Sequence, residues 1–152
     1  MTDTTDKTDR DVVEALRLDH QLCFALYGAA NRVTRLYRPL LDALGLTYPQ
    51  YLAMLVLWED SPRTVGALGA ALDLESSTLT PLLKRLEAQG LVARRRDPED
   101  ERRVIVALTA AGAALREPAR SVPQDLLCQL NLPLAELADL RERLKGLAVQ
   151  DR

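Results

Sequence analysis

The sequence of 152 residues contains little of what metal sites, disulfide frameworks and membrane spans require. It has two cysteines, Cys23 and Cys128, one histidine, and an aromatic content of only 4%. Since no Cys-x-x-Cys pair occurs and the carboxylates lack ligand spacing, we expect no metal site and no cofactor. There is no uncharged apolar run of about 18 residues and no signal-peptide pattern, which predicts a cytoplasmic protein without a membrane segment.

An excess of basic charge is also missing, because the net charge is −2. Apolar residues make up 47% of the chain and charged residues 28%, which suits a soluble domain with a real core. Any binding to nucleic acid must therefore depend on a local cluster of basic side chains, because the charge of the whole chain does not favour it.

The N-terminal part of the chain predicts a long helix. Residues 1–10 are polar and acidic, which indicates a disordered arm. Apolar residues then recur at helical spacing over 11–44, and Gly45 is expected to end the helix. Such a helix exceeds the size of a small domain, so we expect one end to pack on a partner chain.

The C-terminal part also predicts helices. One begins after Thr109 and is expected to be kinked or split near Pro118 and Pro123, and a last helix covers about 133–149. Together with residues 11–45, the segment 109–150 has more apolar faces than one small domain needs. We therefore expect an all-helical dimer interface.

The centre of the chain, 47–108, predicts a winged helix-turn-helix. Thr47 and Gln50 resemble a capping box at the start of a short helix over about 49–59. Two helices and two strands then follow in order, over 64–72, 76–89, 91–96 and 102–108. The predicted fold is mainly α, one domain over 11–152 with a small β-hairpin as its wing.

Hydroxyl and basic side chains gather on the second helix of the pair and on the hairpin. The candidate DNA-binding residues are Ser76, Ser77, Thr78, Thr80, Lys84, Arg85, Arg94, Arg96, Arg102 and Arg103. Asp100 lies close enough in sequence to orient Arg102, and an arginine held at a hairpin tip suits a minor groove. Taken alone, the arginine run equally fits the solvated face of a hairpin. Its combination with the helix pair favours DNA binding.

The segment LESSTLTPLLKRLEAQGLVARRRDPEDERRVIVALTAAG resembles the core of the MarR family of bacterial regulators. Within it, DPEDERRVIVALT is similar to the wing motif of that family, an Asp-x-Arg followed by a strand that ends in Leu-Thr. The resemblance covers about residues 15–148. It implies a winged-helix homodimer that binds a pseudo-palindromic operator in double-stranded DNA and usually represses transcription.

The segment LDHQLCFALYGAANRVTRLYRPLLDALGLTYPQYLAMLVLWE resembles the organic hydroperoxide sensors of that family, the OhrR type. The resemblance implies that Cys23 is the peroxide-reactive residue and that Tyr37 and Tyr48 hydrogen-bond its sulfur. It also implies that Cys128, found in the two-cysteine members, resolves the sulfenic acid to a disulfide. Whether that disulfide lies within or between chains stays open.

The residues around Cys23 suit this chemistry. The thiolate is the nucleophile toward a peroxide, and tyrosine hydroxyls in an apolar pocket stabilise it by hydrogen bonding. Tyr27, four residues after Cys23, shares its helix face and is a weaker candidate for the pocket. From spacing alone, a lone cysteine on an apolar helix face is usually an inert packed residue, and this holds for both cysteines.

Three functions remain in competition. The leading hypothesis is a repressor that an organic hydroperoxide releases from DNA through Cys23. The alternative is a MarR-type repressor released by a small aromatic or apolar ligand, with incidental cysteines. A thiol peroxidase would leave the basic wing unexplained, so we expect no enzyme.

Overall fold

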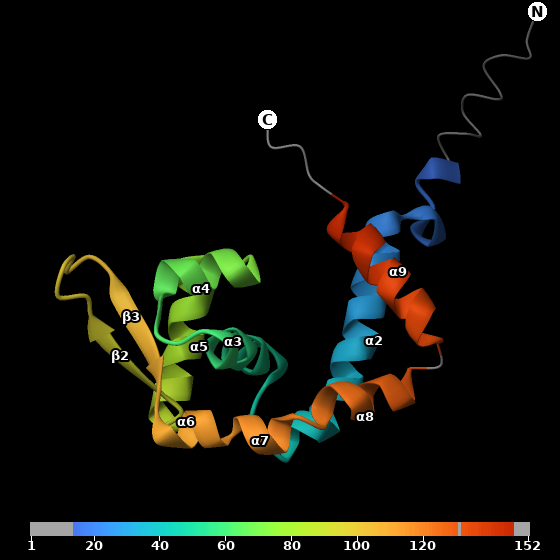
Figure 1. Cartoon of the computed structure of the whole chain (residues 1–152). Helices are drawn as coiled ribbons and strands as arrows, with labels where there is room; N and C mark the ends of the chain where they lie inside the picture. The colour runs from blue at the N-terminus through green and yellow to red at the C-terminus, as the bar shows by residue number, and fades with distance from the viewer. Residues whose placement is uncertain (1–13, 131, 148–152) are drawn as a thin grey trace, which may run out of the picture. The chain divides into compact units, whose positions relative to one another are not determined.

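The computed structural model describes residues 14–130 and 132–147 (Figure 1). The chain divides into two compact units, Met1–Tyr37 and Arg38–Arg152. The predicted arm over residues 1–10 lies outside the described residues. Among the helices of the described ranges, none is long and apolar enough to cross a membrane.

The N-terminal helix differs from the prediction. In place of one helix over 11–44, the described residues form a 3-10 turn, η1 (Leu18–His20), followed by α2 (Leu22–Asp42). The prediction of a continuous helix was therefore wrong in this part. As a result, Cys23 lies in the first turn of α2 and not in the interior of a longer helix.

Local hydrogen bonds explain the break. Arg17 and Gln21, on either side of η1, both have an extended backbone. The side-chain amide of Gln21 donates to the carbonyl oxygens of Ala15 and Arg17, at 2.6 and 3.0 Å. These bonds satisfy the carbonyl groups of the preceding turn, whose helical partners are missing where a helix ends.

The junction between the first two long helices follows the prediction. Gly45 has a φ of 68°, the left-handed conformation that glycine adopts most readily after a helix. The next helix, α3 (Tyr48–Glu59), begins with the predicted capping box. The hydroxyl of Thr47 accepts from the N–H of Gln50, and the Gln50 side chain accepts from the N–H of Thr47 at 2.9 Å.

A helix pair and a hairpin form the predicted winged helix. Its elements are β1 (Arg63–Thr64), α4 (Val65–Leu72), α5 (Ser76–Ala88), β2 (Val92–Arg96) and β3 (Val104–Leu108). The antiparallel sheet has the order β1-β3-β2, so the hairpin gains a third, two-residue strand that the sequence did not reveal. Figure 1 shows the β2–β3 hairpin projecting beside α5.

Leucines on one face of α5 hold this region together. The predicted apolar face, Leu79, Leu82, Leu83 and Leu86, is buried. The helix contacts β2, and Val92 and Val106 of the sheet are also buried. Since a fully buried leucine or valine side chain contributes about 1.5–3 kcal/mol, this face fixes α5 firmly beneath the wing.

Four helices follow the wing within the described residues up to 147. They are α6 (Ala110–Ala114), α7 (Arg116–Ala119), α8 (Val122–Gln129) and α9 (Leu134–Lys145). The predicted split near the two prolines is confirmed, with Pro123 in the first turn of α8. The last helix is shorter than predicted and ends at Lys145, while residues 148 and 149 lie outside the described ranges.

Candidate nucleic-acid interface and cysteine sites

The start of α5 presents hydroxyl groups. Ser76, Ser77 and Thr78 are exposed in its first turn, and Thr80 is half-buried. The N-cap residue, Glu75, makes no side-chain capping bond, whereas threonines cap α3, α4 and α6. The N–H of Thr78 donates to the carbonyl of Glu75 at 3.0 Å, so the N–H groups left for an external acceptor are those of Ser76 and Ser77. The helix dipole favours an anion there.

A close approach of α4 and α5 sets the position of that first turn. A Cβ at Gly69 would lie 2.8 Å from the carbonyl oxygen of Leu74, so only glycine fits. The N–H of Leu74 donates to the carbonyl of Gly69 at 2.9 Å. Between them Asp73 adopts a left-handed conformation with φ 53°. The short connection of a helix-turn-helix is thus built from backbone geometry.

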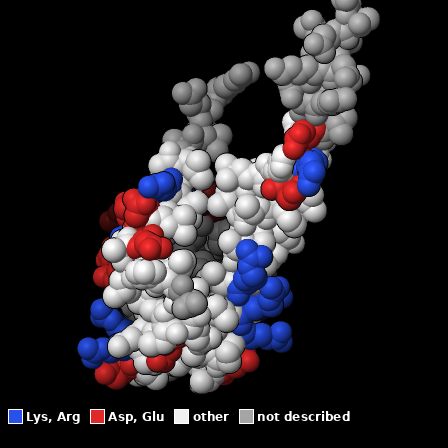
Figure 2. Space-filling view, turned by 90° about the vertical axis from the view of Figure 1, so that its right-hand side faces the viewer, with Lys and Arg blue, Asp and Glu red and all other residues white. Residues whose placement is uncertain are grey.

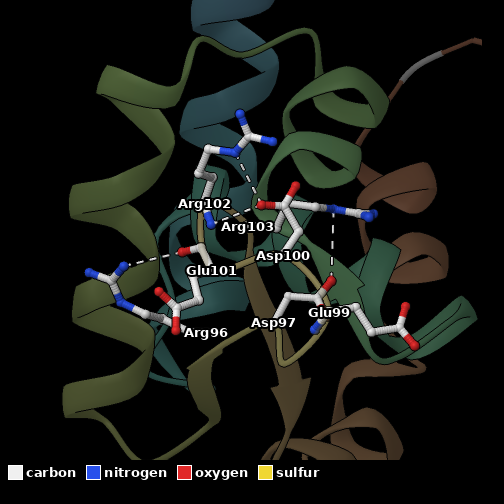
Figure 3. Close-up of polar contacts among 7 residues, drawn as sticks. All are labelled: Arg96, Asp97, Glu99, Asp100, Glu101, Arg102 and Arg103. Carbon is white, nitrogen blue, oxygen red and sulfur yellow. Dashed lines mark hydrogen bonds and ion pairs between the residues drawn. The ribbon is translucent and has the colours of Figure 1, made fainter.

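The tip of the wing holds Arg102 outward. Asp100 Oδ1 accepts from the backbone N–H of Arg102 at 3.1 Å and from its Nε at 3.2 Å (Figure 3). The Arg102 side chain is nevertheless 92% exposed. The expected contact between these two residues is present, and it orients the guanidinium while leaving most of its donors accessible.

A second acidic residue supports the base of the tip. Asp97 is nearly buried, and its side chain accepts from the N–H of Glu99 at 3.0 Å and lies 3.8 Å from Arg103 Nε. Arg96 Nη1 donates to the carbonyl oxygen of Glu101 at 3.1 Å. Figure 3 shows Arg102 directed to Asp100, Arg103 to Asp97 and Arg96 to the backbone of Glu101, so the acidic segment orders the arginines as well as reducing their net charge.

Arg94 has a different environment from the other wing arginines. Its side chain is only 23% exposed and forms an ion pair with Glu87, with 2.6 Å between Nη2 and Oε2. The hydrogen bonds from Arg94 hold the pKa of the Glu87 carboxyl below its usual value. The sequence analysis predicts a DNA contact for Arg94 as for the tip arginines, but in the structure its donors are largely used within the protein.

A groove of about 390 Å³ lies between the helix pair and the wing. It is lined by Thr64, Val65, Gly66, Ser76, Thr80, Leu83, Arg94, Arg102, Arg103 and Val104. Five of the predicted DNA-binding residues thus line one concave surface, while Ser77, Thr78, Lys84, Arg85 and Arg96 are exposed but do not line it. Sequence reasoning missed Thr64, whose hydroxyl caps α4.

Charge elsewhere on the molecule is mixed. On the face drawn in Figure 2, uncharged atoms cover most of the surface, and the Lys and Arg side chains lie in separate groups with acidic residues between them. Because the net charge of the chain is small, a polyanion must bind a local basic cluster. The arginines of the wing form such a cluster.

The two cysteines lie on different units. Cys23 is in the first turn of α2, Cys128 is near the end of α8, and both are free and exposed. The N-terminal turn of a helix attracts an anion such as a thiolate, a feature that the predicted long helix had concealed. Among the described residues, no cluster of His, Cys, Asp or Glu could hold a metal ion.

The three tyrosines predicted to surround Cys23 are also divided between the two units. Tyr27 and Tyr37 belong to α2, where Tyr27 is 67% exposed and Tyr37 is half-buried. Tyr48 begins α3 in the other unit, and burial raises its pKa, so its hydroxyl remains a proton donor at neutral pH. The assignment of these three residues to a pocket around Cys23 stays a prediction.

Comparison with known proteins identifies relatives over most of the chain. The model of the SarA/Rot family of transcriptional regulators matches residues 35–117. The organic hydroperoxide resistance transcriptional regulator of Bacillus subtilis is 52% identical over 112 residues, which cover 74% of this chain and 76% of the relative. These matches span the helix pair and the wing.

Solved structures agree with the fold. A MarR mutant of Escherichia coli in complex with operator DNA is 30% identical, covers 84% of this chain and 94% of its own, and has a TM-score of 0.76. The chain belongs to the MarR family of transcriptional regulators. It is thus a DNA-binding transcriptional regulator with a winged-helix fold.

Another relative in this family, AbfR, has been solved in several states. Reduced AbfR bound to DNA is 40% identical, with 88% of this chain and 93% of AbfR covered and a TM-score of 0.72. A disulfide-formed AbfR is 37% identical, with 91% and 92% covered and a TM-score of 0.59. AbfR comes from Staphylococcus epidermidis.

Proposed function

We propose that this regulator is a homodimeric repressor that senses organic hydroperoxides through Cys23 and then leaves its operator. The observation that carries the proposal is the pair of exposed thiols on helices that flank a winged helix, in a chain 52% identical to an organic hydroperoxide resistance regulator. A repressor of this kind acts in the cytoplasm, where its DNA lies and where thiols are kept reduced.

The proposed chemistry consumes one hydroperoxide molecule for each Cys23–Cys128 disulfide that forms. The Cys23 thiolate attacks an oxygen of ROOH, the S–O bond forms, the O–O bond breaks, and the departing alkoxide takes a proton from water to give ROH. The Cys128 thiol then attacks the sulfenic sulfur, so that an S–S bond forms and water leaves. The two cysteines lose two electrons and the peroxide gains them. Free, exposed thiols make both steps accessible.

Disulfide formation needs the two Cα atoms within about 7 Å. If closing that distance moves a helix, the spacing of the two winged helices in the dimer changes, and both no longer fit half-sites one helical turn apart. The reduced, DNA-bound and disulfide-formed structures of AbfR support a redox-dependent state in the family.

The dimer part of the proposal rests on apolar side chains of the terminal helices. Leu134, Leu140 and Leu144 of α9 are 69, 47 and 42% exposed in the single chain. In α2, Leu22 is 61% exposed. Such apolar stripes are typical of helices that become buried against a second copy. Sedimentation of the reduced protein at micromolar concentration is expected to give the mass of a dimer.

The thiol step is tested by replacing Cys23 with serine. A duplex that the wild-type protein selects from a random-sequence library serves as the probe. We expect stoichiometric cumene hydroperoxide to lower wild-type affinity at least tenfold and dithiothreitol to restore it. Cys23→Ser is expected to bind the duplex normally and to stay bound after peroxide. Release of the serine variant by peroxide contradicts the sensor assignment.

Replacement of Cys128 separates the two steps. Cys128→Ala is expected to keep the first oxidation, seen by a sulfenic-acid reagent at Cys23, and to form the sulfinic acid more readily. A non-reducing gel of oxidised wild type distinguishes a covalent dimer from an intrachain bond. A disulfide in neither form rules out Cys128 as the resolving residue.

A ligand-released repressor is the second candidate, favoured by a pocket between α3 and the α7–α8 region. Its lining combines aromatic and apolar side chains with both signs of charge, which suits a small aromatic or apolar ligand: Tyr51, Leu55, Trp58, Glu59, Arg116, Ala119, Arg120 and Pro123. Its volume of about 180 Å³ is below the roughly 300–1,000 Å³ of typical ligand pockets, so the thiol mechanism is preferred. A ligand that raises the melting temperature and releases Cys23→Ser from DNA would favour this candidate.

A further inference from the structure

The carboxylate of Glu87, in the last turn of α5, takes three hydrogen bonds from Arg94 of β2. Oε1 accepts from the backbone N–H of Arg94 at 3.0 Å. Oε2 accepts from Nε at 2.9 Å and from Nη2 at 2.6 Å. Charge-assisted bonds to a planar guanidinium are the strongest and most directional of protein hydrogen bonds. One side chain of α5 is therefore tied to both the backbone and the side chain of β2.

The location of Arg94 in the sheet makes this contact structurally significant. The sheet has the order β1-β3-β2, so β2 is an edge strand. Arg94 is paired with Val106 of β3, a fully buried residue. The backbone N–H of Arg94 is bonded to Glu87, a group outside the sheet. The edge strand of the wing, β2, is thus hydrogen-bonded to α5, the second helix of the helix-turn-helix.

We infer that Glu87 is a positioning residue for DNA binding, and that Arg94 serves this clamp in preference to a phosphate contact. The inference rests on the DNA-binding function of the winged helix. The start of α5 and the tip of the wing must reach different parts of the duplex at once, so the angle between them controls affinity. Glu87 contacts no DNA in this scheme and acts through Arg94.

The geometry makes the angle sensitive to this contact. At about 3.3 Å per residue, the tip lies roughly 15 Å along the hairpin from Arg94. A tilt of about 10° at Arg94 would displace Arg102 by roughly 2.5 Å, which is close to the full length of a hydrogen bond. The bonds that Arg102 donates to Asp100 orient it within the tip, but they leave the tilt of the hairpin to the contact with α5.

Replacement of Glu87 by glutamine gives opposite results under the two interpretations. If Glu87 acts only through its charge, removing an acid near DNA strengthens binding, because less repulsion opposes the phosphates. If Glu87 is a clamp, Gln places an amide N–H₂ against the donors of Arg94 and the wing loses its fixed angle. We expect Glu87→Gln to weaken binding of the selected duplex at least tenfold.

A matched control comes from the same wing. Glu99 is exposed at the tip, and only its backbone N–H takes part in a hydrogen bond there. Glu99→Gln removes the same charge and is expected to bind as tightly as the wild type or more tightly. Equal weakening by both substitutions contradicts the clamp.

The salt dependence distinguishes a positioning role from a direct contact. Losing one phosphate contact lowers the slope of log K against log salt by about 0.9. We expect Glu87→Gln to leave the slope unchanged while affinity falls. Arg94→Lys, which keeps the charge but lacks the planar fork, is expected to weaken binding to a similar extent.

These experiments use the full-length reduced protein, with melting temperatures confirming that each variant is folded. Wild-type or tighter binding by Glu87→Gln overturns the inference, and if that variant fails to fold, near-normal binding by Arg94→Lys does so. Failure of the wild type to select any duplex would instead refute DNA binding itself, and the clamp with it.

Discussion

Gly112 lies at the point where the C-terminal helices join the winged helix, and its substitution gives a sharp test of the packing there. Its carbonyl oxygen accepts from the buried Trp58 Nε1 at 2.8 Å. Its N–H donates to the hydroxyl of Thr109, which in turn donates to the carbonyl of Gly90 at 2.6 Å. A side chain at position 112 must therefore fit between α3 and the segment that follows α5.

The structure leaves no room for it. A Cβ on Gly112 would lie 1.9 Å from the carbonyl oxygen of Leu91, and ordinary van der Waals contact begins at 3.4 Å. The two backbones would have to separate by about 1.5 Å, which breaks the 2.8 Å bond from Trp58. A buried group left without its partner costs about 1–3 kcal/mol, and overpacking costs about 1–3 kcal/mol more.

We therefore expect Gly112→Ala to lower the free energy of unfolding by about 3 kcal/mol or more. For a domain of this size that corresponds to a fall in melting temperature of about 6–12 °C, measured at equal protomer concentration. Urea denaturation followed by circular dichroism gives the same quantity through the midpoint, provided that the slope m is unchanged.

Gly66 in α4 is the matched control. A Cβ there would meet nothing within 4 Å, so Gly66→Ala is expected to leave stability unchanged or to raise it by up to about 1 kcal/mol. If Gly112→Ala melts within 2 °C or so of the wild type, the close packing of α6 against Leu91 is not what holds this junction.

Three further results are expected. Arg102→Ala should weaken binding of the selected duplex, by roughly 1–3 kcal/mol at one base pair if the arginine reads a base edge, or evenly across sequences if it contacts phosphate. Thr64→Ala removes the hydroxyl that caps α4 at 3.1 Å, and should lower the unfolding free energy by about 1 kcal/mol in urea titrations. Because Arg94 lowers the pKa of Glu87, the stability from this pair is present above the ordinary value of 4.5 and is lost as the pH falls through the lowered pKa, so the difference in melting temperature between wild type and Glu87→Gln should shrink at low pH.

The sequence predicted most of the fold because its signals are local. Gly45 ends α2 through its own backbone freedom, and Thr47 with Gln50 begins α3 through bonds that span three residues. The leucines of α5 repeat at helical spacing, and all four are buried as predicted. Each of these features depends on residues that lie within one or two helical turns of one another in the sequence.

The missed features depend on contacts that periodicity does not report. The apolar pattern continues across Gln21, but the side chain of this residue bonds to earlier carbonyls and ends the preceding turn. The strand β1 has only two residues and exists through its pairing with β3. Arg94 resembles the other wing arginines in the sequence, and only the turn between α5 and β2 brings it against Glu87, seven residues earlier.

In the proposed mechanism, oxidation at Cys23 and the affinity for DNA are linked. If oxidation lowers the affinity for DNA by some factor, thermodynamic linkage requires DNA to oppose formation of the disulfide by the same factor. For a two-electron couple, each tenfold change in affinity corresponds to about 30 mV in reduction potential. A tenfold loss of affinity for each disulfide formed should thus make the potential of the Cys23–Cys128 couple about 30 mV more positive when saturating selected duplex is present, measured in a thiol–disulfide buffer. An unchanged potential would mean that the two sites are not coupled, because a ligand that does not discriminate between two states of a protein shifts neither of them, however tightly it binds.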